Sequence, residues 1–114
     1  MLHEMTLFPK PYASIASGQK TIELRLYDEK RQSIQIGDQI RFTNTEDASQ
    51  TTLCEVVGLH VFKDFRELYE NLPLLKCGYT PEDVDNAHPD DMLTYYSKEK
   101  QAQYGVVGIE LKRI

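Results

Sequence analysis

The sequence has 114 residues, of which 40% are hydrophobic and 27% are charged, and its formal net charge is −5. This length fits one domain over residues 1–114, and the composition is that of a globular chain rather than a disordered one. The negative charge argues against a broad basic face of the kind that binds long duplex DNA. A small basic pocket remains compatible with it.

The sequence carries no signal for secretion or for insertion into a membrane. Its first residues lack a basic start followed by an apolar run, and no segment approaches the roughly 20 apolar residues that span a bilayer. The only cysteines, Cys54 and Cys77, lie far apart in the sequence, which indicates free thiols in a reducing compartment. We therefore expect a cytoplasmic protein without a membrane partner.

In the first half of the chain, short alternating segments separated by polar turns predict strands, with one helix between the first two. In chain order we expect a strand over His3–Leu7, a helix over Pro11–Ser17, a strand over Thr21–Leu26, a polar loop over Tyr27–Gln35 and a strand over Gln39–Thr43. Along the second strand, Thr21, Glu23 and Arg25 share one face because successive side chains point to opposite sides.

The second half is predicted to hold one long strand, several short helices and a closing strand. In chain order we expect a polar loop over Asn44–Gln50, a strand over Thr51–Phe62 bent at Gly58, a helix capped by Asp64, short helices opened by Thr80-Pro81 and His88-Pro89, a turn capped by Ser97, and a strand over Gly105–Ile114. Strands and helices do not alternate regularly, so we expect the α+β class, as a small and mainly antiparallel β-barrel with short helices at its ends.

The segment from Gly18 to Arg25 carries the clearest chemical pattern. Glu23 and Arg25 are two residues apart on a strand, so their side chains emerge about 7 Å apart on one face, and Lys20 at the preceding junction is close enough to reach that face. A guanidinium offers a planar fork to a phosphate, while a carboxylate accepts from an amine or acts as a general base. From spacing alone, the alternative is a solvent-exposed ion pair that contributes little to stability.

Two further groups of residues leave alternatives open. Lys30 and Arg31 form either a second basic wall of the same cleft or an ordinary charged loop. Tyr95, Tyr96 and Tyr104 form either a stacking surface for a base or part-buried helix residues. The three histidines show no ligand spacing with the cysteines, so we expect no metal site and no cofactor.

The pattern Gly-x-Lys-x-x-Glu-x-Arg, from Gly18 to Arg25, resembles the signature of the ASCH domain family. The similarity extends over nearly the whole chain through four further segments in the family's order: Asp28–Arg31, Ile36–Phe42, Phe65–Leu68 and Tyr104–Ile109. The resemblance implies a PUA-like β-barrel with a cleft beside the first helix, and members that bind RNA or nucleotide-like ligands.

The leading hypothesis is therefore a binding domain for RNA or a modified nucleotide, and its acidity favours a short target. The expected ligand-binding residues are Lys20, Thr21, Glu23, Arg25, Lys30 and Arg31. The alternative is a small hydrolase, either a ribonuclease or an amidohydrolase of acetylated cytidine, with Lys20 and Glu23 as catalytic residues. Lys20 matches the lysine of family amidohydrolases of this kind, whereas Glu23 occupies the position of their threonine. A third interpretation is a protein-interaction module.

Overall fold

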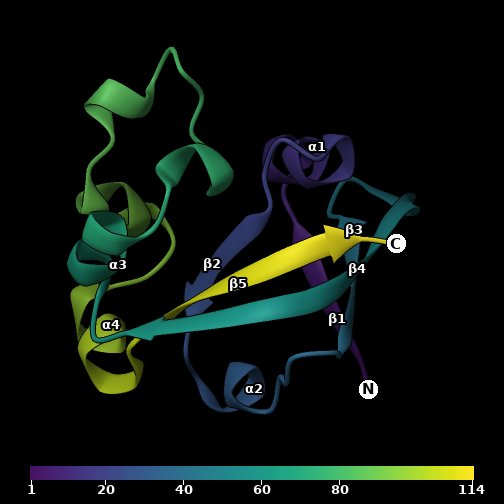
Figure 1. The fold of residues 1–114 in the computed structure, drawn as a ribbon, viewed down its shortest axis with the longest axis horizontal. Helices are drawn as coiled ribbons and strands as arrows, with labels where there is room; N and C mark the ends of the chain where they lie inside the picture. Colours follow the sequence, from purple (N-terminus) through teal and green to yellow (C-terminus); the bar gives the residue numbers. More distant parts are fainter.

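Five strands form one curled sheet in the order β1-β3-β4-β5-β2 (Figure 1). The structure is a computed structural model that describes residues 1–114. The strands are β1 (Leu2–Leu7), β2 (Ile22–Leu26), β3 (Gln39–Asn44), β4 (Asp47–Phe62) and β5 (Val106–Arg113). Only the β1–β3 pair is parallel, and the sheet curls into a half-barrel, so the predicted α+β class and mainly antiparallel topology are confirmed. β1 and β2 are its two edges.

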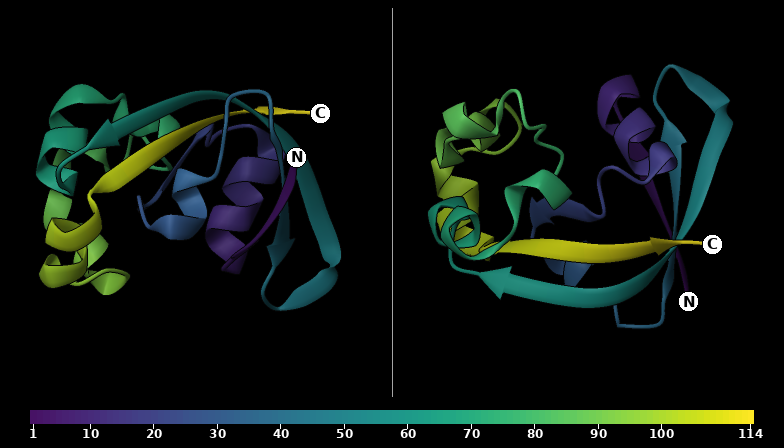
Figure 2. Two further views of the ribbon diagram at one scale, coloured as in Figure 1. Left: turned by 90° about the horizontal axis from the view of Figure 1, so that it is seen from below. Right: turned by 45° about the horizontal axis from the view of Figure 1, so that its top comes forward.

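Short helices cover both faces of this sheet. They are α1 (Pro9–Ser17), α2 (Glu29–Gln32), α3 (Phe65–Asn71) and α4 (Lys98–Tyr104), with three 3-10 turns, η1 (Leu74–Lys76), η2 (Val84–Asn86) and η3 (Pro89–Thr94). Figure 2 shows β4 and β5 arching over α1, whereas α3, α4 and the segment between them gather at the end of the sheet where β4 ends and β5 begins. None of these helices has the length and apolar character that a bilayer crossing requires.

The sheet separates two hydrophobic cores. The first packs α1 against residues of β1, β3, β4 and β5, including Ile15, Phe42 and Ile109. The second packs the apolar residues of β2 against α3 and η3, with Phe65 and Leu68 at its centre. Because both faces of the sheet are covered, a side chain on either face of β2 is removed from water.

Several predicted local signals are confirmed. Asp64 caps α3 by accepting the backbone N–H of Glu67 at 2.9 Å, and Ser97 caps α4 through the N–H of Lys100. The register of β4 against β5 shifts between Val56 and Gly58, where the sequence predicted a bend. Cys54 and Cys77 are both buried and both free.

Three predicted boundaries are wrong. The expected loop over Tyr27–Gln35 contains α2, a single turn capped by Asp28, and all four of its residues are polar, so no apolar pattern marks it. The expected loop over Asn44–Gln50 shrinks to a tight turn because β4 already begins at Asp47. Thr80 does not open a helix, because its N–H donates to the Asp83 carboxylate at 2.6 Å and closes a turn before η2.

Candidate functional site

The alternating side chains of β2 place the charged residues inside the half-barrel rather than on its surface. Leu24 and its apolar neighbours on β2 pack toward α3, so Glu23 and Arg25 point to the opposite face. Their cross-strand partners on β5 are Ile109 and Val107, which belong to the core that packs against α1. The alternation itself was predicted correctly, but a solvent-exposed strand face is excluded, because Glu23 is buried.

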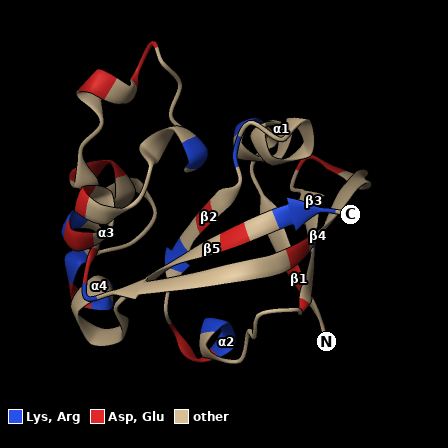
Figure 3. Ribbon diagram, in the orientation of Figure 1, with Lys and Arg blue, Asp and Glu red and all other residues tan.

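Glu23 is held between two cations. Lys20 Nζ lies 2.8 Å from Glu23 Oε1, and Arg25 Nε lies 2.8 Å from Glu23 Oε2. The exposed fractions of the three side chains are 11% for Lys20, 4% for Glu23 and 14% for Arg25. The three groups therefore converge, as the spacing predicted, and each carboxylate oxygen has its own cation. In Figure 3, blue and red segments mark basic and acidic residues along β2 and the loop before it.

The local backbone brings Lys20 to this position. After α1, Gly18 adopts a left-handed conformation with φ of 86°, which reverses the chain at the end of the helix. The N–H of Lys20 then donates to the Ser14 carbonyl at 3.0 Å, and the N–H of Thr21 donates to the Lys76 carbonyl at 2.9 Å. These bonds fix the junction from which the Lys20 side chain reaches Glu23.

The two cations keep Glu23 ionised. Burial acts to raise the pKa of Glu23, but attraction to Lys20 and Arg25 outweighs it and leaves this pKa below its ordinary value. Burial likewise acts to lower the pKa of Arg25, and Glu23 reverses that effect, so the guanidinium stays charged. With two cations and one anion, two minus one, the cluster carries a formal charge of +1.

Arg25 also joins the two edges of the sheet. Its guanidinium donates to the backbone carbonyl of Thr6 on β1 at 2.9 Å. The edge strands β1 and β2 are not paired with each other, so an opening remains between them in the half-barrel, and we call this opening the seam. The Arg25 side chain spans it. The ion cluster therefore lies at the seam, where the two edge strands come together.

A second ion pair lies near the seam. Arg31 contacts Asp28 at 3.2 Å and is largely buried, and its Nε atom is buried with no hydrogen-bond partner. Burial raises the pKa of Tyr96, while the charges of both Arg25 and Arg31 act to lower it. Lys30, by contrast, is exposed on α2 and makes no ion pair with the cluster.

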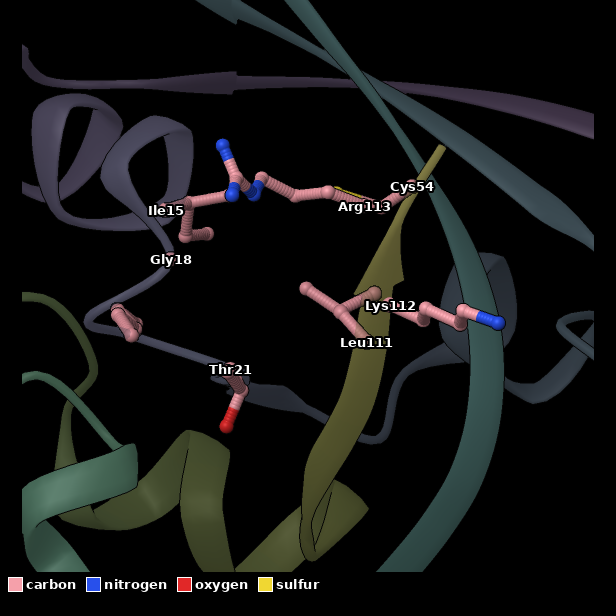
Figure 4. A pocket seen from close by; sticks show the side chains of 8 residues that line it. Ile15, Gly18, Thr21, Cys54, Leu111, Lys112 and Arg113 are labelled. Atoms are coloured by element: carbon pink, nitrogen blue, oxygen red, sulfur yellow. The ribbon is translucent and has the colours of Figure 1, made fainter.

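A hollow of about 280 Å³ lies on the other side of Lys20, between α1 and the end of β5 (Figure 4). It is lined by Ile15, Gly18, Lys20, Thr21, Cys54, Leu111, Lys112 and Arg113. Of the predicted site residues, only Lys20 and Thr21 line it. In Figure 4 the Arg113 side chain reaches toward Ile15, where it donates to the Ala16 carbonyl, while the ammonium of Lys112 points away.

Arg113 is a residue that the sequence argument missed. It follows Ile109 and Leu111 on the same face of β5, so alternation along that strand could have placed it beside α1.

The three tyrosines singled out in the sequence differ in their exposure to solvent. Tyr95 is exposed, whereas Tyr96 and Tyr104 are half-buried. No three His, Cys, Asp or Glu side chains gather closely enough to hold a metal ion.

Two solved structures from proteins of similar length match the whole chain. The crystal structure of hypothetical protein PH0355 is 32% identical, with a TM-score of 0.81 and complete coverage of both chains. The solution NMR structure of protein PF0455 from Pyrococcus furiosus is 31% identical, with a TM-score of 0.73, and covers 100% of this chain and 98% of that one.

More distant structures share the fold. The crystal structure of ASCH from Zymomonas mobilis has a TM-score of 0.67 at 13% identity, over 97% of this chain and 66% of that one. A comparison with curated proteins gives no match. The sequence matches the ASCH domain over residues 5–114, which is nearly its whole length. The chain therefore belongs to the ASCH domain family.

Proposed function

We propose that this chain is a cytoplasmic binding protein for RNA or a nucleotide, and that the ligand contacts the Lys20–Glu23–Arg25 cluster at the seam. The observation that carries this proposal is the pairing of one buried carboxylate with two cations, each at 2.8 Å. Such a cluster is a preorganised positive site in a chain whose overall charge is −5. Local positive charge in an acidic protein favours a short anionic target over a long duplex.

The cluster has unused hydrogen-bond donors. An ammonium has three N–H donors and a guanidinium has five. Lys20 uses one on Glu23, which leaves two, and Arg25 uses one on Glu23 and one on Thr6, which leaves three. Because these groups are already fixed in place, little side-chain entropy is lost when phosphate oxygens or base carbonyls accept from them.

The geometry gives less support to a hydrolase with Glu23 as general base. A general base works best when its pKa lies near the operating pH. The pKa of Glu23 is held below its ordinary value, and both of its oxygens already contact cations. We therefore interpret Glu23 as the residue that positions Lys20 and Arg25.

Binding can be tested by fluorescence anisotropy with labelled single-stranded RNA, with nucleotides as competitors. Lys20→Gln should weaken binding about 10- to 100-fold, as expected for the loss of a charge-assisted hydrogen bond. Lys63→Gln is a matched control, since Lys63 is exposed and the change in net charge is identical. Equal affinities for the two variants would contradict the proposal, as would wild-type protein that binds none of these ligands. Hydrolysis of acetylated cytidine or RNA by the wild type would favour the enzyme alternative.

A further inference from the structure

Two exposed aromatic rings from distant parts of the chain form a tilted pair. Phe8 is 59% exposed and Tyr95 is 56% exposed, and their ring centroids lie 6.5 Å apart with the planes 31° from parallel. Phe8 sits between β1 and α1, and Tyr95 directly follows η3. Single exposed apolar residues are ordinary on a protein surface, but two rings brought together from distant segments form a defined surface.

This aromatic pair adjoins the seam. Phe8 stands two residues after Thr6, whose carbonyl accepts a hydrogen bond from Arg25. On the other side, the Tyr95 ring lies 6.3 Å from that of Tyr96. The pair therefore lies next to the end of β1 that Arg25 contacts at the seam.

The pair offers an aromatic surface to a planar base. The two rings are in contact at a centroid distance of 6.5 Å, and each is still more than half exposed, so a base can stack on the ring surface that faces solvent. Tyr96 is not available in the same way, because its ring stacks on Phe65 in the second core with centroids 6.0 Å apart.

The charges beside the pair favour an anionic occupant. At the seam, Lys20 and Arg25 supply two positive charges and Glu23 one negative, so the cluster carries a formal charge, two minus one, of +1, while Arg31 is paired with Asp28. A protein partner would need a contact area of roughly 1,000 Å² or more, far beyond two rings. Unstacked bases of single-stranded RNA combine a π-face with a phosphate, and both parts find a match here.

We infer that Phe8 and Tyr95 form a stacking platform for one unstacked base, with its phosphate directed toward Arg25. This inference rests on the proposed function and deepens it, because it names a base-bearing single strand as the ligand class. The two aromatic side chains supply affinity for a base of any identity, since every base has a π-face.

The chain contains no Trp, so Tyr95→Trp introduces a single indole at the pair. A base that stacks on this indole should quench its fluorescence when short single-stranded RNA is added, and an abasic strand of the same length should not. Phe8→Ala and Tyr95→Ala should each weaken RNA binding about 5- to 150-fold and leave the affinity for the abasic strand unchanged. Val61→Ala, at an exposed position on β4, is the matched control and should bind like wild type.

The outcomes separate the two proposals. If wild-type protein binds RNA but the alanine variants bind equally well, or the indole is not quenched, the stacking role of the aromatic pair is wrong and the proposed function stands. If the alanine variants lose affinity for the abasic strand to the same extent, the rings do not act by stacking and this inference is wrong. If wild-type protein binds neither RNA nor nucleotides, or the pair binds only a protein, both proposals fail.

Discussion

Replacing Glu23 by Gln removes the negative charge on which two buried cations depend. The substitution keeps the size of the side chain but leaves Lys20 and Arg25 without an ion-pair partner, because Glu23 is the carboxylate that both contact. In the folded protein all three side chains are largely withdrawn from water. Hydration therefore compensates little for the lost pairing, and we expect the folded state to be strongly destabilised.

The magnitude follows from the burial of the cluster. Removing one partner of a buried ion pair typically costs about 3–5 kcal/mol. For a domain of this length, 1 kcal/mol corresponds to a change in melting temperature of about 4 °C, so Glu23→Gln should lower it by about 12–20 °C. Lys20→Gln should have a smaller effect, because Arg25 remains to neutralise Glu23.

Urea denaturation followed by circular dichroism measures the loss directly. Glu46→Gln provides the control, since Glu46 lies exposed in the turn between β3 and β4. A difference between the two variants of less than about 1 kcal/mol, below the range expected for a buried pair, would refute the reasoning. It would mean that the cations of the cluster are solvated in the folded protein.

Two further predictions concern the acid side of the stability profile and the backbone at Gly105. Hydrogen bonds from His3 and the Gln35 amide hold the pKa of Asp38 at about 2, below an unfolded value of about 3.9. The unfolded chain then binds more protons, so stability should fall as the pH drops through this interval, and Asp38→Asn should flatten that dependence in urea titrations at several pH values. Gly105 combines φ of 72° with ψ of −172°, and a Cβ there would lie 2.9 Å from the Phe62 carbonyl oxygen. At Gly37 the positive φ alone disfavours a side chain, because a Cβ there would meet no atom within 4 Å. Thermal melts should show Gly37→Ala costing about 1–2 kcal/mol and Gly105→Ala more; equal costs would contradict the close contact.

Much of the ion cluster follows from short-range sequence patterns. The two-residue period of a strand puts Glu23 and Arg25 on one face, and the glycine after a short helix brings Lys20 beside them. These are local effects, so they survive whatever packs on the sheet. The irregular order of strands and helices indicated a mainly antiparallel barrel, and the resemblance to the ASCH family implied a PUA-like one; the structure confirms a curled, mainly antiparallel sheet.

The surroundings of the cluster could not be predicted in the same way. Alternation marks Ile22 and Leu24 as buried and suggests that Glu23 faces water, but α3 covers one face of β2 and the other face continues the core in which α1 packs. That arrangement depends on contacts between segments far apart in the sequence. The meeting of Phe8 and Tyr95 depends on the same long-range packing, and no local pattern indicates it.

The location of the ligand is best tested by NMR spectra of the Arg Nε–H groups and aromatic protons during titration with a short single-stranded RNA. We predict shifts at the Nε–H of Arg25 and at the rings of Phe8 and Tyr95. Arg41, which pairs with Glu4 on the exposed surface, should remain unchanged. Shifts at Arg41 or Arg66 with an unchanged Arg25 would contradict a binding site at the seam.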